Sequence, residues 1–210
     1  MQVIFMKINH VIRTMIISDF YLNAGLSLFG PIFAVFVTQQ IPGATLQVVG
    51  FGAAITQMVK VALEIPIARY LDKNHGEYDD FYSLILGNIL LISTPFLFIL
   101  ASRIGHLYAI QAVGGAALAF IVPPWNAIFS RHLDKRQESS EWAYESIAIG
   151  IATAGAAAVG GIVAQKFGFR TVFLIGGLIA IVGAVEQMKI YRDLKARVKQ
   201  GTVKPQPDGL

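Results

Sequence analysis

Six long apolar stretches, separated by short polar breaks, constrain what this chain can fold into. A helix needs about 20 mostly apolar residues to cross the hydrocarbon core of a bilayer. Only 14% of the 210 residues are charged, whereas soluble domains average about 25%. The sequence therefore predicts an all-α integral membrane protein with six transmembrane helices, at residues 14–38, 46–68, 81–101, 106–129, 142–165 and 170–190.

The breaks between these stretches are too short to hold a soluble domain. We therefore expect one transmembrane domain over residues 1–190, with consecutive helices antiparallel. The first stretch has no signal-peptide cleavage pattern, so we expect it to be retained as a helix. Residues 191–210 are polar and basic. We expect them to form a cytoplasmic tail, a frayed helix extension followed by disorder, that either is solvated or contacts anionic lipid.

Lysine and arginine are unevenly distributed between the two expected sides of the membrane. One side holds the chain ends and a large group of basic residues in the breaks: Arg69, Lys73, Arg131, Lys135 and Arg136. The other side holds three: Arg103, Lys166 and Arg170. Because cytoplasmic loops carry the excess of Lys and Arg, both termini are expected in the cytoplasm, with the protein in the plasma (inner) membrane.

Two of the expected helices carry polar side chains inside their apolar stretches. Asp19 and Asn23 share one face of the first helix, and Lys60 and Glu64 share one face of the second. A charge at the bilayer centre costs about 2.5–3.5 kcal/mol on insertion scales, so these residues are functional candidates. Our hypothesis is an Asp19–Lys60 pair with Glu64 as a second partner of Lys60. The alternative is that Lys60 extends to the cytoplasmic surface and Glu64 only neutralises it.

Two further helices carry features with both a structural and a functional interpretation. Glu145 falls in the first turn of the expected fifth helix, where the positive helix end stabilises a carboxylate. We prefer that explanation to a transport role. In the fourth helix, Pro123 and Pro124 interrupt the hydrogen bonding just before Asn126. The kink either turns a polar group into a cavity or only improves packing.

Small residues recur at every fourth position along the expected fifth helix. They are Ala148, Ala152, Ala156, Gly160 and Ala164, called the small-residue ladder below. Such a ladder lets the backbone of another helix approach closely. We expect an interface here, in preference to an alanine-rich helix without a special partner.

The sequence has no signature of an enzyme or of a cofactor. Gly-x-Ser-x-Gly, His-Glu-x-x-His and phosphate-loop motifs are missing. There is no cysteine, and the four histidines are scattered over expected helix ends and loops. We therefore expect no enzymatic activity, no metal, no cofactor and no nucleic acid partner.

The break after the second stretch resembles the signature loop between helices 2 and 3 of the major facilitator superfamily, roughly Gly-x-x-x-Asp-Arg-x-Gly-Arg-Arg. Asp72 and Lys73 correspond to its Asp-Arg pair, whereas Ala68 replaces the leading glycine and Gly76 comes one residue late.

Two more segments resemble the same family. Residues 160–173 are similar to the end of helix 5 and the start of helix 6, and residues 111–117 fall where many members have Arg-x-x-Gln-Gly in helix 4. At the second of these segments Gln111 replaces the arginine. Ala156 and Ala157 stand where antiporters of the family have Gly-Pro.

The resemblance implies one six-helix half of a two-half transporter that moves a small solute by alternating access. The two halves have the same orientation, so a parallel homodimer can supply both. Helix 2 of one copy would then pack on the small-residue ladder of the other. The implied substrate or coupling-ion residues are Asp19, Asn23, Gln111 and Asn126. The implied cytoplasmic gate loop comprises Arg69, Asp72, Lys73 and Gly76, with Asp72 near the start of the partner's helix 5.

Two other interpretations are consistent with the sequence. The chain could be one half of a split transporter that pairs with a different chain, or a non-transporting scaffold that assembles other membrane subunits. The sequence names no substrate and does not separate uniport, symport and antiport.

Overall fold

The computed structural model describes residues 8–74 and 77–199, and these residues form an all-helical bundle. The eight helices of this part are α1 (His10–Ser27), α2 (Phe33–Gln40), α3 (Leu46–Asn74), α4 (Glu77–Ile99), α5 (Ile104–His132), α6 (Glu138–Phe167), α7 (Phe169–Met188) and α8 (Ile190–Lys199). Five spans in the described part are long and apolar enough to cross a membrane: α3, α4, α5, α6, and α7 continued into α8. The chain is therefore an all-α integral membrane protein.

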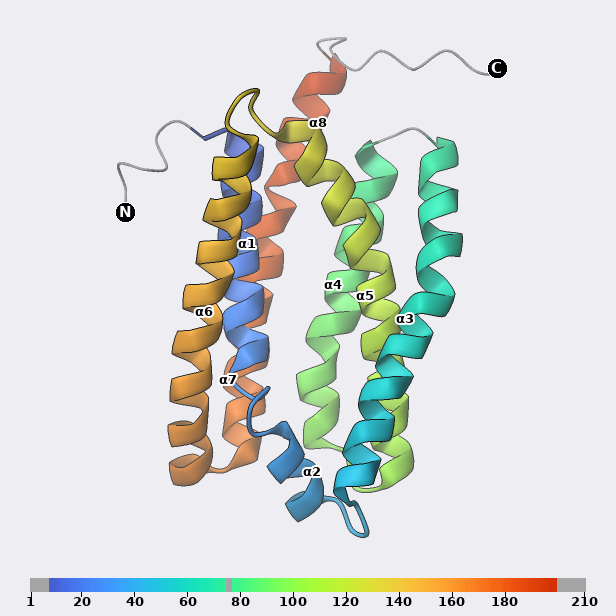
Figure 1. Cartoon of the computed structure of the whole chain (residues 1–210), viewed down its shortest axis with the longest axis vertical. Helices are drawn as coiled ribbons and strands as arrows, with labels where there is room; N and C mark the ends of the chain where they lie inside the picture. The colour runs from blue at the N-terminus through green and yellow to red at the C-terminus, as the bar shows by residue number, and fades with distance from the viewer. Residues whose placement is uncertain (1–7, 75–76, 200–210) are drawn as a thin grey trace.

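The long helices form two groups of three that lie side by side (Figure 1). One group contains α3, α4 and α5, and the other contains α1, α6 and α7. The grouping does not follow chain order, because α1 packs mainly on α6 and α7, whereas α5 packs mainly on α3 and α4. Contacts between α4 and α7 join the two groups. The start of α1, the α5–α6 connection and α8 lie at one end of the bundle, and α2 lies at the other.

The first predicted helix, residues 14–38, is broken in the structure. α1 ends at Ser27, residues 28–32 form turns, and α2 begins at Phe33. Pro31 explains the break, because proline has no N–H for the helical ladder and disfavours helical geometry at the preceding Gly30. α1 is not among the five spans above. Its 18 residues include Arg13, Asp19 and Asn23, which lower its apolar content.

The other predicted helices are present, but several continue beyond their apolar stretches. α3 runs to Asn74 and α6 begins at Glu138, four positions before the predicted start. The first part of the predicted polar tail is helical and belongs to α8. Ile190 and Leu194 of α8 are fully buried in one cluster with Ile12 of α1. The folded unit therefore extends through Leu194.

α1 and α7 cross at glycines, which lets their backbones touch. A Cβ on Gly25 would lie 2.4 Å from the carbonyl oxygen of Gly176, and a Cβ on Gly176 would lie 2.5 Å from that of Gly25. Two turns further along, the hydroxyl of Ser18 donates a hydrogen bond to the carbonyl oxygen of Gly183 at 2.9 Å. This crossing fixes the position of α1, which carries Asp19.

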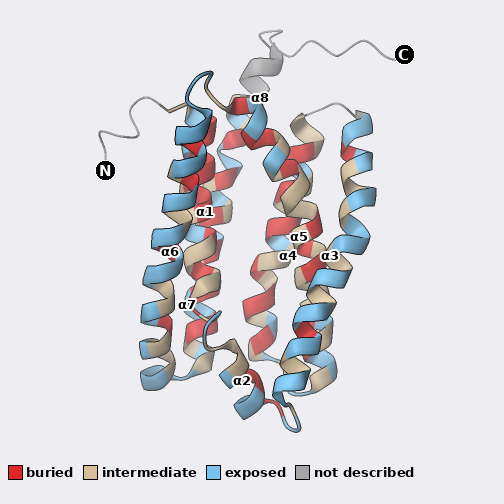
Figure 2. Ribbon diagram, in the orientation of Figure 1, coloured by how far each residue is buried: buried red, intermediate tan, exposed pale blue. Residues whose placement is uncertain are grey.

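The helices differ strongly in how far the bundle covers them (Figure 2). In the most apolar part of α3 only 6% of residues are buried, and in α6 only 11%, whereas α4, α5 and the α7 span reach 33–44%. Figure 2 shows mostly exposed residues along α3 and α6. These two helices are the uncovered edges of the two groups.

Candidate functional site

A pocket of about 450 Å³ lies between α1, α5 and α6. It is lined by Asp19, Asn23, Ile121, Val122, Trp125, Asn126, Trp142, Glu145, Ser146 and Ile149. Three of the four predicted substrate or ion residues, Asp19, Asn23 and Asn126, thus meet in one place. Its volume is within the range of roughly 300–1,000 Å³ that is typical of small-molecule sites.

Two carboxyl groups face each other in this pocket. Asp19 of α1 is 7% exposed and Glu145 of α6 is 3% exposed. Their side chains lie close enough to interact directly, and the indole of Trp125 lies beside Asp19. The preferred sequence interpretation of Glu145 does not hold, because α6 begins at Glu138 and Glu145 lies two turns inside it. The favourable effect of a helix end is confined to the first turn.

Several buried polar atoms of the pocket have no hydrogen-bond partner within the described residues. They include both carboxylate oxygens of Glu145 and the Nε1 of Trp125. Asn23 uses its amide locally, donating from Nδ2 to the backbone carbonyl of Asp19 at 2.9 Å. Unpaired buried polar groups are costly and call for an explanation, so these atoms make the pocket the candidate site.

Aromatic rings form one wall of the pocket. Trp125 stacks on Phe129 with ring centroids 4.7 Å apart, and Trp142 lies 4.6 Å from Phe129 and 5.9 Å from Trp125. Sequence spacing offered a signal for this wall, because Trp142 and Glu145 are three residues apart and so share a helix face. Trp125 directly precedes Asn126 in α5.

Gln111, the fourth predicted site residue, lies elsewhere. It lines a separate pocket of about 250 Å³, whose lining comes mainly from α4, α5 and the α1–α2 region. The hydroxyl of Thr56 lies 3.0 Å from its Oε1 and 3.1 Å from its backbone carbonyl oxygen. A Cβ on Gly52 would contact its Nε2 at 3.2 Å. The side chain of Gln111 therefore links α3 to α5.

The predicted pair of Lys60 and Glu64 is present on α3, with Nζ and Oε2 3.9 Å apart. Asp19 does not join it. In the described part of the chain its side-chain neighbours are Glu145 and Trp125. The reason is the helix grouping, because α1 packs mainly on α6 and α7 while α3 packs mainly on α5. The hypothesis of an Asp19–Lys60 pair is therefore wrong.

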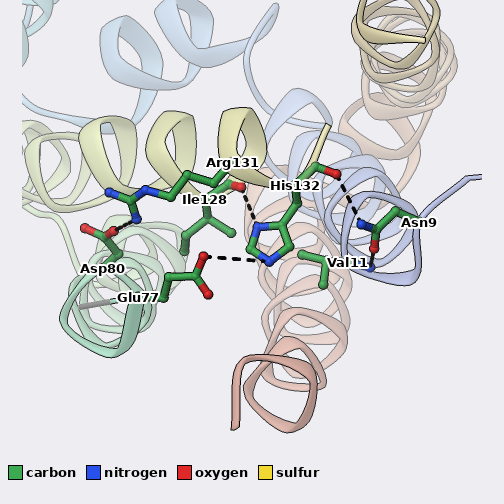
Figure 3. Close-up of polar contacts among 7 residues, drawn as sticks. All are labelled: Asn9, Val11, Glu77, Asp80, Ile128, Arg131 and His132. Carbon is green, nitrogen blue, oxygen red and sulfur yellow. Dashed lines mark hydrogen bonds and ion pairs between the residues drawn. The ribbon is translucent and has the colours of Figure 1, made fainter. Parts of the chain in front are cut away.

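Polar contacts join three helices at the end of the bundle where α1 begins (Figure 3). Arg131 of α5 forms an ion pair with the buried Asp80 of α4. The buried His132 places Nδ1 2.9 Å from the Ile128 carbonyl oxygen and Nε2 3.8 Å from Glu77 Oε1.

The start of α1 is tied to the same cluster. The side chain of Asn9 caps α1, accepting from the N–H of Val11 at 3.0 Å. Its Nδ2 also donates to the carbonyl oxygen of His132 at 3.2 Å (Figure 3). Of the predicted gate loop, Arg69, Asp72 and Lys73 are exposed on the last turns of α3. Gly76 lies outside the described residues.

The small-residue ladder faces α1 of the same chain along part of its length. Ala152 and Gly160 are buried, and Ala148, Ala156 and Ala164 are half-buried. A Cβ on Gly160 would lie 1.8 Å from the carbonyl oxygen of Leu28. The ladder therefore lets α1 approach α6 closely, and its buried members are not on the free surface.

The geometry defines an all-α integral membrane protein with a polar, carboxylate-bearing pocket between its helices. The chain belongs to the Major Facilitator Superfamily, whose sequence profile matches residues 15–208. Its fold is similar to the in meso crystal structure of the POT family transporter PepTSo, with a TM-score of 0.68 and 12% sequence identity. The match covers 97% of this chain and 40% of that chain. A comparison with curated protein sequences finds no significant match.

Proposed function

We propose that the chain carries out secondary active transport of a small solute by alternating access, with the α1–α5–α6 pocket as the solute site. Membership of the Major Facilitator Superfamily supports membrane transport and not enzymatic chemistry. The observation that carries the assignment of the site is the Asp19–Glu145 carboxyl pair, buried between largely apolar helices. Intramembrane carboxyl groups are costly and mark substrate or ion pathways.

Alternating access requires a second six-helix unit, and we propose a parallel homodimer. The uncovered edges α3 and α6 support this arrangement. Gln57 on α3, and Ser146 and Thr153 on α6, are exposed polar residues that lipid tails would solvate poorly. Beside the buried ladder, α6 also exposes Gly150 and Ala154, which a second backbone could approach closely. The interface proposed for α6 thus moves from the buried members of the ladder to this neighbouring strip.

The proposed orientation places both termini in the cytoplasm and the protein in the plasma (inner) membrane. Its support is the positive-inside rule. The end of the bundle that holds the start of α1 and α8 carries most described basic residues of the connections, among them Arg69, Lys73 and Arg131. In this proposal the end of α3, with Asp72, contacts the start of the partner's α6 and acts as the cytoplasmic gate. An acidic group is favoured there by about 0.3–1 kcal/mol.

Disulfide cross-linking in native membranes tests the homodimer. The natural chain has no cysteine, so two differently tagged copies can carry Gln57→Cys and Ala154→Cys on a clean background. We expect cross-linking between copies. Ala152→Cys is the matched control, because Ala152 is 3% exposed and should not react. Suppose that Ala154→Cys, like the control, does not cross-link to Gln57→Cys. If membranes that contain the protein still take up solute, the second unit is a different chain. If they take up no solute, a scaffold role replaces transport.

Single-cysteine labelling tests alternating access. Asn126→Cys places a thiol in the pocket, and a membrane-impermeant maleimide should reach it from either side of the membrane. Ile181→Cys is the control, since Ile181 is an exposed apolar residue of α7 that should face lipid and stay unlabelled. Labelling of Asn126→Cys from one side only, under all solute conditions, would contradict alternating access at this pocket.

A further inference from the structure

The ionisable side chains that line the α1–α5–α6 pocket are all acidic. Two carboxyl groups, Asp19 and Glu145, line it, and the described lining contains no Lys, Arg or His. The nearest intramembrane cation on α3, Lys60, is already paired with Glu64. The pocket therefore attracts positive charge and repels anions.

The carboxyl group of Glu145 lines the pocket, and its close neighbour there is the carboxyl group of Asp19 and not a cation. Glu145 is 3% exposed, and neither of its oxygens accepts a hydrogen bond within the described residues. Two adjacent acidic groups in a low-dielectric setting are stabilised by a cation placed between them or by protonation.

The aromatic wall selects the kind of cation. The indoles of Trp125 and Trp142 line the pocket, and indole is the best of the aromatic side chains at attracting a cation to its face. Ile121, Val122 and Ile149 add aliphatic lining, and the remaining lining residues, Asn23, Asn126 and Ser146, are polar and uncharged. A metal ion fits poorly, because the described residues contain no group of three or more His, Asp or Glu side chains able to hold one. Metal ions such as Ca²⁺ require about six to eight oxygen ligands.

We propose, building on the transport function above, that this pocket takes a monovalent organic cation, an amine or quaternary ammonium with an apolar body. The cationic centre lies between Asp19 and Glu145. The apolar body contacts the tryptophan wall and the aliphatic residues. The amide of Asn126 is an additional polar contact at the exposed rim.

The chain supplies its own reporter for this site. It contains two tryptophans, Trp125 and Trp142, and both line the pocket. Intrinsic tryptophan fluorescence of the full chain in lipid nanodiscs therefore reports occupancy of this site. Three probes of similar size separate charge from shape: benzyltrimethylammonium, its neutral isostere neopentylbenzene, and the anion phenylacetate.

We expect a saturable change in emission with benzyltrimethylammonium and none with the other two probes. Asp19→Asn and Glu145→Gln should each weaken binding at least tenfold, because each removes one charge of a desolvated pair. Glu186→Gln is the matched control, since Glu186 is a carboxylate of α7 paired with Lys189 outside the pocket. Circular dichroism and gel filtration confirm that each variant is folded. Equal binding of neopentylbenzene or phenylacetate, or unchanged binding in both carboxylate variants, would overturn the cation site.

Uptake into proteoliposomes separates this inference from the proposed function. Benzyltrimethylammonium that binds but is never taken up supports the cation site and argues against transport. Uptake of an anionic or neutral solute without cation binding overturns the cation site and leaves transport standing.

Discussion

Gly160 of α6 lies against the backbone of Leu28, at the end of α1. A Cβ at position 160 would stand 1.8 Å from the carbonyl oxygen of Leu28 and 2.7 Å from its carbonyl carbon. The obstacle is backbone and not the end of a flexible side chain, so only a separation of α1 from α6 can relieve it. The contact thus sets the distance between the two helices that supply Asp19 and Glu145 to the pocket.

Gly160→Ala should therefore lower the thermal stability of the protein. Overpacking of this kind costs about 1–3 kcal/mol. Gly161→Ala is the matched control in the same helix, because a Cβ there meets nothing within 4 Å. Helix propensity favours alanine over glycine by roughly 0.8–1 kcal/mol, so the control should be neutral or stabilising. Thermal melts of the two variants in the same detergent measure the difference, and equal melting temperatures would show that α1 and α6 do not meet at Gly160.

Arg131→Ala should destabilise the protein more than Asp80→Asn. Asp80 is 3% exposed, so loss of Arg131 leaves a buried carboxylate without its cation, whereas Asp80→Asn removes the charge itself. We expect a cost of about 1–3 kcal/mol for Arg131→Ala. The double variant Arg131→Ala/Asp80→Asn should recover much of the lost stability, because it has no buried charge left without a partner. Urea or thermal unfolding of the four proteins completes a double-mutant cycle. Additive effects in the cycle would show that the two side chains do not interact.

Lys60→Met should reduce the yield of folded protein more than Glu64→Gln. The two side chains are paired at 3.9 Å on α3 and are only partly exposed. In Lys60→Met the remaining Glu64 carboxylate is too short to reach the membrane surface, so its charge stays inside the membrane. In Glu64→Gln the remaining Lys60 can extend its ammonium toward the surface, which lowers the cost. The double variant should recover most of the yield. Fluorescence-detected gel filtration of tagged protein measures it. Equal losses in the two single variants, without rescue, would indicate a role other than mutual neutralisation.

Arg136→Gly should stabilise the α5–α6 connection. Arg136 has φ of 69°, a left-handed conformation that costs a non-glycine residue roughly 1–2 kcal/mol. Glycine adopts this conformation freely but loses more entropy on folding, so we expect a net gain of about 0.5–1 kcal/mol. Lys135→Gly is the control: it removes the same charge in the same turn but has no positive φ to relieve. Thermal melts should show a higher melting temperature for Arg136→Gly and a lower one for Lys135→Gly than for the wild type.

The apolar stretches could be predicted from the sequence because the bilayer imposes a length on each spanning helix. That rule is local, and it failed only where local chemistry opposed it. The Gly30–Pro31 step divides α1 from α2. α3 and α6 are longer than their apolar segments, because polar residues at the end of α3 and at the start of α6 are also helical. Leu194 was assigned to the tail because its neighbours are charged, yet it is buried against α1.

The site was less predictable because it depends on which helices become neighbours. The periodicity of α1 placed Asp19 and Asn23 on one face, but helix periodicity cannot say what that face meets. An expected packing of the first two helices suggested Lys60 as the partner, whereas α1 packs on α6 and meets Glu145. An α6 start set four residues late then gave Glu145 a helix-end explanation. The two errors together concealed the pair of carboxyl groups.

Asp19→Asn should abolish uptake of benzyltrimethylammonium into proteoliposomes while leaving expression and melting temperature nearly unchanged. The substitution keeps the size of the side chain and removes the negative charge that attracts the cationic centre. Asn23→Ala should only reduce uptake, because the Asn23 amide is engaged with the backbone carbonyl of Asp19 at 2.9 Å and is not a charge partner. Uptake assays at equal protein density, with the wild type and protein-free liposomes as references, measure both variants. Full uptake in Asp19→Asn would remove Asp19 from the solute site.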